Sequence, residues 1–350
     1  MGDATDNAQP EDPTPDSWGR SFGPQSDVLA IHPGAVGDVV LLGHLLARLG
    51  GRAAVVAKGQ RGRLLRELTF TPPDEPGAKY PLAERVIDFD TWLMNGRVVL
   101  RSSGRRPEDF LGHCHRLIAF YPPTETEVRR LARATQAHRH WLLPIRPDED
   151  YPHHLLDLWA QKIDMKPLVA PHEGQAAGAL PVWQVPAEHQ ASARCAAARL
   201  GLGEERPFVL IHPGSGGRIK CWPLENFVTL ARRLSDRGDV GVLFVVGEAE
   251  IDRWGEDALG PLAESFPLLR CGELVQLAGL LAQAKAYTGN DSGPSHLAAA
   301  LGTPTLALFG ATNPVHFAPV GRTVRVVQGE TMAAIEVETV LAGLDALLRL

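Results

Sequence analysis

The chain has 350 residues, which is enough for two domains of about 150 residues each. It is 44% hydrophobic and 22% charged, and no apolar run is long enough to span a bilayer, so the composition indicates a soluble globular protein. The net charge of −6 excludes the strongly basic surface typical of nucleic-acid-binding proteins. Residues 27–180 carry 20 basic and 18 acidic residues, and this mild positive balance indicates an anionic partner for that half.

The first 26 residues are rich in Pro, Asp, Gly and Ser, and they carry too little apolar surface to order themselves. We expect residues 1–26 to form a disordered or loosely docked acidic tail. The stretch has no basic region followed by an apolar one, so no secretory signal is predicted and we expect a cytoplasmic protein. The chain has no C-x-x-C spacing, so no zinc site is predicted. We expect free thiols at all four cysteines, which are Cys114, Cys195, Cys221 and Cys271.

The first domain, predicted over residues 27–180, opens with an apolar strand at 28–31, a turn containing Gly34 and Gly37, and a helix at 38–49. Further strands are predicted over residues 53–57, 85–89, 97–100 and 115–120. Helices are predicted over residues 63–68, 126–138 and 153–163. Alternating strands and helices indicate a parallel sheet that is covered on both faces. Residues 164–190, with repeated Pro, Gly and Ala, are typical of a linker.

The second domain, predicted over residues 181–335, begins with a helix at 188–200 and continues with strand, Gly-rich turn and helix. A strand at 240–246 and helices at 252–264 and 274–284 follow. A last helix, within residues 336–350, ends the chain.

Five residues are repeated almost unchanged in the two halves. Ala-Ile-His-Pro-Gly at 30–34 and Leu-Ile-His-Pro-Gly at 210–214 each end an apolar strand and precede a Gly-containing turn and a helix. The repeat predicts two Rossmann-like halves, with a ligand in the cleft between them.

The stretch from 287 to 310, Y-T-G-N-D-S-G-P-S-H-L-A-A-A-L-G-T-P-T-L-A-L-F-G, predicts a strand, a polar turn, a helix and a second buried strand. Pro294 suits the first helical turn and Gly302 ends the helix. The free N–H groups at such a helix start can bind an anion. The alternative is an ordinary capped helix, with Asp291 or Ser292 as N-cap.

Three other groups of residues can carry chemistry. Asp38, at a helix start, is either an N-cap or a general base. The stretch 212–220, H-P-G-S-G-G-R-I-K, is either an anion-binding loop with two cations or a flexible loop with solvated charges. Glu248 and Glu250 follow a buried strand and either hold a ribose or are solvated acids. The absence of G-x-G-x-x-G disfavours a nicotinamide enzyme.

Three of these segments together resemble glycosyltransferase family 9, the ADP-heptose lipopolysaccharide heptosyltransferases. They are H-P-G-A-V-G-D-V-V-L, H-P-G-S-G-G-R-I-K-C-W-P-L-E-N-F and N-D-S-G-P-S-H-L-A-A-A-L-G-T-P-T-L-A-L-F-G-A-T. The resemblance implies an α/β GT-B fold with two Rossmann-like domains whose parallel sheets face each other across a cleft. It also implies that the helix at 336–350 packs back toward the N-terminal domain.

The resemblance further implies an inverting, metal-independent transfer of a sugar, heptose from ADP-heptose, in lipopolysaccharide core assembly. Asp38 would be the base and Lys220 the cation facing the diphosphate, with no metal site and no cofactor. The donor site would be formed by Ser215, Gly216, Glu248 or Glu250, Asp291, Ser292, Gly293 and His296.

The acceptor is less defined by the sequence. Arg97, Arg101, Arg105 and Arg106 are candidates for an acceptor-binding anion site or belong to a solvated loop. Such an acceptor, anionic or a glycolipid, would bring the protein into peripheral contact with the inner face of the cytoplasmic membrane. Two alternatives remain open: a family member that uses another nucleotide sugar or a soluble acceptor, and a non-catalytic relative that binds a nucleotide sugar.

Overall fold

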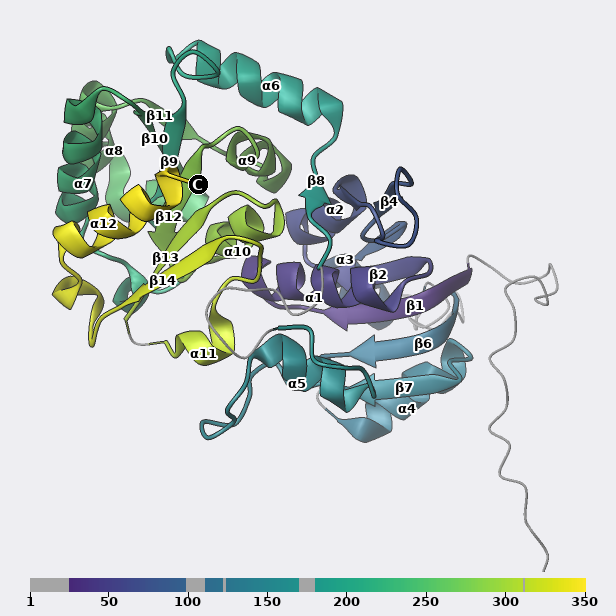
Figure 1. Ribbon diagram of the computed structural model, residues 1–350. Helices are drawn as coiled ribbons and strands as arrows, with labels where there is room; N and C mark the ends of the chain where they lie inside the picture. Colours follow the sequence, from purple (N-terminus) through teal and green to yellow (C-terminus); the bar gives the residue numbers. More distant parts are fainter. Residues whose placement is uncertain (1–24, 99–110, 122–123, 170–179, 311) are drawn as a thin grey trace, which may run out of the picture.

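The computed structural model describes residues 25–98, 111–121, 124–169, 180–310 and 312–350, apart from the side chains of Gln25 and residues 94–98. These residues build two parallel sheets, each with helices on both faces (Figure 1). The two-domain α/β architecture predicted from the sequence is therefore confirmed.

The first sheet has the strand order β5-β2-β1-β6-β7. Its strands are β1 (Gln25–His32), β2 (Ala53–Ala57), β5 (Arg85–Asp88), β6 (His113–Ala119) and β7 (Arg139–Leu142). The helices of this half are α1 (Val36–Leu49), α2 (Gln60–Glu67), α3 (Phe89–Val98), α4 (Glu125–Ala134) and α5 (Leu155–Lys162).

The second sheet has the order β11-β10-β9-β12-β13-β14, which is that of a doubly wound nucleotide-binding fold. Its strands are β9 (Phe208–His212), β10 (Gly241–Val246), β11 (Leu268–Arg270), β12 (Ala286–Asn290), β13 (Thr305–Phe309) and β14 (Val324–Gln328). The helices of this half are α6 (Ala187–Ala198), α7 (Leu224–Arg237), α8 (Glu248–Ser265), α9 (Leu274–Leu281), α10 (Gly293–Ala300), α11 (Pro314–Phe317) and α12 (Val337–Leu348).

A small antiparallel sheet that the sequence did not predict lies beside the first half. It consists of β3 (Thr69–Phe70), β4 (Tyr80–Pro81) and β8 (Trp183–Gln184). Because β8 pairs with β3, the chain stays with the N-terminal half until after residue 184, a few residues beyond the predicted domain boundary.

The alternation of side chains along the strands distributes the core between the layers. In β1, Leu29 and Ile31 belong to a cluster on one face of the first sheet, whereas Val28 and Ala30 face α1 on the other. The cluster on the α1 face continues into the second half through residues such as Leu297 of α10. The two halves are thus joined by apolar packing, with α1 against α10 and α2 against α9.

Three features differ from the sequence-based expectation. Gln25 and Ser26, assigned to the tail, form the start of β1 and pair with β6. Arg97, assigned to a strand, lies in α3, because that helix continues directly from the end of β5. The C-terminal helix α12 packs on α7 and the second sheet instead of returning to the N-terminal domain, since its apolar residues Val340, Leu344 and Leu347 belong to the core of that half.

Hydrogen bonds through two histidines tie the halves together near α5. The Nε2 atom of His154 lies 2.9 Å from the carbonyl oxygen of Ala318, and that of His316 lies 2.6 Å from the carbonyl oxygen of Tyr151. The Nδ1 atom of His154 accepts the N–H of Leu156 at the start of α5. A neutral His154 ring therefore serves as acceptor at one nitrogen and donor at the other, and protonation removes the acceptor.

Burial keeps this and two neighbouring histidines neutral. It lowers the pKa of His154 to about 4, of His296 to about 4 and of His44 to about 3. In the unfolded chain these histidines are protonated below their ordinary pKa of 6.5. In the folded chain His154 is protonated only when the pH falls to about 4. Their contribution to stability is thus present above pH 6.5 and is lost progressively toward pH 4.

We predict that His154→Gln makes stability less sensitive to acid. Between pH 7 and 5, the free energy of unfolding of the wild type should fall by about 2 kcal/mol more than that of the variant, because the buried ring must be protonated on unfolding. Urea denaturation at the two pH values measures this difference. The neighbouring exposed His153→Gln is the matched control and should retain the wild-type pH dependence; an equal fall in all three proteins would contradict the assignment.

Candidate functional site

The repeated His-Pro-Gly segments lie at corresponding places in the two halves. β1 lies between β2 and β6, and β9 lies between β10 and β12, so each is the strand at which the order of its sheet reverses. Ligands of open α/β sheets bind outside the carboxyl end of the strands at this point. The structure therefore places residues 33–35 and 213–217 where the sequence repeat predicted a ligand.

The N-termini of α1 and α10 meet between the two halves. A Cβ atom added at Gly293 would collide with the Val36 side chain and lie 3.2 Å from the Gly37 nitrogen. A Cβ atom at Gly37 would lie 3.0 Å from Cδ2 of His296. Both positions need glycine because the helix starts are in contact, and the positive ends of two helices point into one region.

The anion-binding potential of α10 has support in its hydrogen bonds. Pro294 occupies the first turn, as predicted, and within the described residues the backbone N–H groups of Ser292 and Gly293 donate to no protein acceptor. Ser292 is the N-cap residue, but its side chain makes no capping hydrogen bond. The carboxylate of Asp291 pairs with Lys220 instead of capping the helix.

Asn290, at the end of β12, fixes the 213–222 loop. Its side-chain nitrogen donates to the carbonyl oxygens of Pro213 and Gly214, at 2.8 and 3.1 Å, and its side-chain oxygen accepts the N–H of Trp222 at 2.9 Å. The Ser215 hydroxyl donates to the carbonyl oxygen of Asp291 at 2.8 Å. The loop is therefore held at both ends by hydrogen bonds to Asn290 and Asp291.

The middle of this loop faces open space. A Cβ atom added at Gly216 or Gly217 would meet no atom within 4 Å, and within the described chain their N–H groups have no protein acceptor. Lys220 returns to the site, where its Nζ atom lies 2.6 Å from Oδ2 of Asp291. The structure thus brings Ser215, Gly216 and Lys220 together with the start of α10, as predicted.

Asp38 faces this group from α1. Its Oδ2 atom accepts the backbone N–H of Ala35 at 2.8 Å, so the carboxylate satisfies the helix start from the third helical position and not as N-cap. Burial raises the pKa of Asp38, against the opposing effect of the Ala35 N–H and the charges of Arg146, Arg61 and Lys220. The same group can therefore serve both the helix start and a proton transfer.

The two glutamates predicted to hold a ribose have different environments. Glu248 is exposed at the start of α8. Glu250 is buried, accepts the N–H of Gly247 at 2.9 Å and lies 3.5 Å from Nε2 of His212. Burial opposes its charge, yet these two donors hold the pKa of Glu250 below its ordinary value. Glu250 thus accepts hydrogen bonds within the fold, whereas Glu248 is open to solvent, and a ribose contact by either glutamate stays a prediction.

Three arginines that sequence reasoning did not single out lie in the site. Arg61 donates to the carbonyl oxygen of Gly34 at 2.8 Å, and Arg253 donates to that of Ser215 at 3.0 Å. The charge of Arg146 lowers the pKa of the Asp38 carboxyl. Each belongs to a helix or loop far along the chain from its partner, so local motif spacing could not identify it. The predicted acceptor residues Arg101, Arg105 and Arg106 lie outside the described residues, as does the side chain of Arg97.

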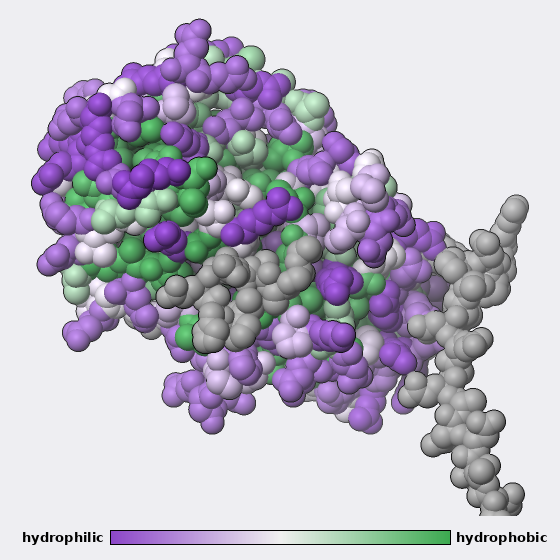
Figure 2. Space-filling view, viewed as in Figure 1, coloured by the Kyte–Doolittle hydropathy of each residue, from purple (hydrophilic) through white to green (hydrophobic). Residues whose placement is uncertain are grey.

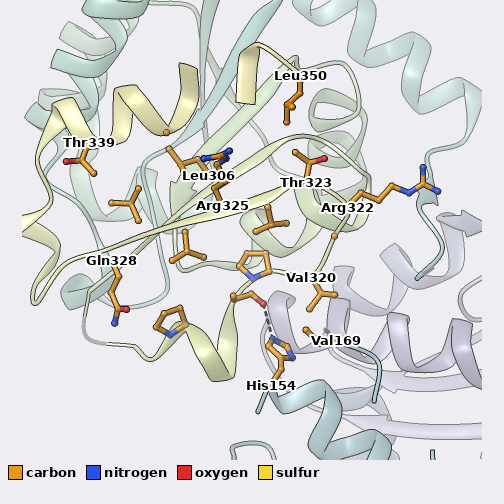
Figure 3. A pocket seen from close by; sticks show the side chains of 18 residues that line it. His154, Val169, Leu306, Val320, Arg322, Thr323, Arg325, Gln328, Thr339 and Leu350 are labelled. Carbon is orange, nitrogen blue, oxygen red and sulfur yellow. Dashed lines mark hydrogen bonds between the residues drawn. The ribbon is translucent and has the colours of Figure 1, made fainter. Parts of the chain in front are cut away.

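Trp222, which follows the loop, is buried, and its indole N–H donates to the carbonyl oxygen of Ile335 at 2.9 Å. A cavity of about 880 Å³ runs beside β14, where hydrophobic residues gather on the surface (Figures 2 and 3), but none of the predicted site residues lines it. The described part of the chain contains no cluster of three or more His, Cys, Asp or Glu arranged to hold a metal, and no helix there is long and apolar enough to cross a membrane.

Comparisons with known proteins concern the sequence and the fold. The model of glycosyltransferase family 9 (heptosyltransferase) matches residues 175–342. Lipopolysaccharide heptosyltransferase 2 of Escherichia coli (strain K12) is 35% identical over 136 residues, a match that spans 37% of this chain and 38% of that relative. The chain thus matches well under half the length of that curated relative.

Solved structures show the fold of the whole chain. A glycosyl transferase family 9 structure from Veillonella parvula has a TM-score of 0.68 at 16% identity and covers 92% of this chain and 97% of its own. The structure of E. coli ADP-heptose lps heptosyltransferase II has a TM-score of 0.64 at 21% identity, with 92% and 98% covered. The likeness shows a GT-B fold, and the C-terminal half of the chain, residues 175–342, matches the model of glycosyltransferase family 9.

Proposed function

We propose that the chain is an inverting glycosyltransferase that moves heptose from ADP-heptose to a hydroxyl group of an anionic acceptor in lipopolysaccharide core assembly. The observation that carries this proposal is the contact between the starts of α1 and α10, which brings a carboxylate and a lysine to one place. The family match and the names of the heptosyltransferase relatives support the choice of sugar.

In this proposal the second half binds the donor. The N–H groups of Gly216, Ser292 and Gly293, with the charge of Lys220, would surround the diphosphate. These groups stabilise the negative charge that develops on the leaving phosphate oxygen as the bond to the sugar breaks. Lysine and helix ends thereby perform the neutralisation for which other transferases use a metal, so we propose a metal-independent reaction.

Asp38 would act on the acceptor. As the acceptor oxygen attacks the anomeric carbon from the face opposite to the diphosphate, the carboxylate takes the hydroxyl proton and the configuration inverts. Burial raises the pKa of Asp38, which makes it a stronger base than an exposed carboxylate and still leaves it in contact with the positive charges of the site.

The acceptor side offers positive charge near this base. Arg146 acts on Asp38 and, with Lys162, lines a pocket of about 480 Å³ whose other walls include Phe120 and Leu158. We propose that this pocket receives an anionic group of the acceptor. Such an acceptor would be reached at the cytoplasmic face of the inner membrane.

Asp38→Asn separates the two roles of the carboxylate. The amide oxygen can still accept the Ala35 N–H, so α1 should keep its start, but the amide cannot take a proton. We predict that kcat falls by a factor of about 10² to 10⁴ while the affinity for ADP stays within twofold. Asp150→Asn, an exposed acid that does not line the acceptor-side pocket, is the control for loss of a nearby negative charge and should keep the wild-type kcat. Full transfer by Asp38→Asn would refute the base assignment.

A thermal-shift screen followed by transfer assays tests the donor. We predict that ADP raises the melting temperature and that UDP and GDP do not, because the proposed donor is ADP-heptose. Binding at 100-fold the dissociation constant stabilises the folded state by about 2.7 kcal/mol, which such a screen detects. Stabilisation by UDP alone would exclude ADP-heptose as donor, and ADP binding without transfer to any acceptor would favour a non-catalytic binding protein.

A further inference from the structure

Arg253, on the first turns of α8, reaches the loop that is proposed to bind the diphosphate. One guanidinium nitrogen donates to the carbonyl oxygen of Ser215 at 3.0 Å, and another lies 3.1 Å from the sulfur of Cys221. These two contacts lie on either side of the open stretch at Gly216 and Gly217. One side chain therefore spans the loop from its beginning to its end.

The contact with Ser215 sets the direction of a peptide group. The C=O and N–H of a trans peptide point in opposite directions, so a carbonyl that faces Arg253 turns the following N–H, that of Gly216, away from it. This N–H has no acceptor among the described residues, and a Cβ at Gly216 would meet open space. Glycine can rotate its peptide groups more freely than other residues, so a fixed direction needs an external partner.

Arg253 also contributes charge. Over the described parts of the chain, no carboxylate forms an ion pair with it, whereas Lys220 is paired with Asp291. Its guanidinium is half-buried and carries a positive charge. The loop is thus backed by a permanent positive charge that its own lysine does not supply.

We propose that Arg253 is a positioning residue that holds the Ser215–Gly216 peptide with its N–H toward the phosphates of a nucleoside diphosphate. This inference rests on the proposed function, because it assumes that the loop binds the diphosphate. Arg253 acts through the loop backbone and through its charge, without touching the reacting atoms.

The test compares ADP with adenosine as calorimetric probes for the full chain, alongside kinetics with ADP-heptose. In Arg253→Gln, the dissociation constant of ADP should rise at least tenfold while that of adenosine stays within twofold. The KM for the acceptor should also stay within twofold. Arg253→Lys, which keeps the charge but not the two-sided contact, should recover part of the ADP affinity.

Two controls separate this role from general damage. Arg233→Gln removes a surface arginine of α7 that pairs with Glu338 of α12 and, in the described part of the chain, makes no contact with the 213–222 loop, so it should behave as wild type. Arg194→Gln, which removes an exposed arginine of α6, should likewise behave as wild type.

The possible results divide clearly. ADP affinity in Arg253→Gln within twofold of wild type would overturn the positioning role alone. Equal losses for ADP and adenosine would also overturn it, since they would indicate a deformed nucleotide pocket. Failure of the wild-type chain to bind ADP would overturn both this inference and the proposed donor.

Discussion

The contact between the starts of α1 and α10 is the constraint on which the rest of the structure depends. Two helix N-termini in contact place like partial charges together, which is unfavourable without compensation. The structure compensates with a carboxylate from each half, Asp38 beside α1 and Asp291 beside α10. Glycines at 37 and 293 make the approach sterically feasible. The pair of helices therefore joins the two halves, and among the residues that the structure describes it leaves the N–H groups of Ser292 and Gly293 without a protein acceptor.

In the proposed reaction, a small set of charges would serve both the donor and the acceptor. Lys220 pairs with Asp291 of the second half and acts electrostatically on Asp38 of the first, so its charge acts on both halves. A diphosphate that enters beside Gly216 brings negative charge to a place already supplied with a lysine and an arginine. Burial keeps the neighbouring histidines His44, His154 and His296 neutral, so they neither attract nor repel a diphosphate there.

Much of this site could be predicted from the sequence, because its turns and helix starts are formed by residues that are close together in the chain. Glycine, proline and polar residues at strand ends identify the turns, and the stretch 287–310 already showed the start of α10. What failed was non-local. The partner of Glu250 is His212, on another strand, and Arg253 and Arg146 approach from distant segments, so no spacing in the sequence relates them to the loops. The position of α12 likewise depends on which apolar surface it covers, and periodicity does not reveal that.

The repeated His-Pro-Gly shows why sequence similarity between the halves does not mean equal chemistry. In each half the glycine makes room for a carboxylate: a Cβ at Gly34 would lie 2.6 Å from Oδ2 of Asp38, and one at Gly214 would collide with Glu250. In the first half that carboxylate remains at the helix start, half-buried and next to three cations, which suits a base. In the second half it is buried beneath the loop and joined to His212, which leaves the loop above it free to present N–H groups. The same backbone pattern thus carries a carboxylate in both halves: we propose the first as a base, whereas the second is engaged by His212 and by the N–H of Gly247.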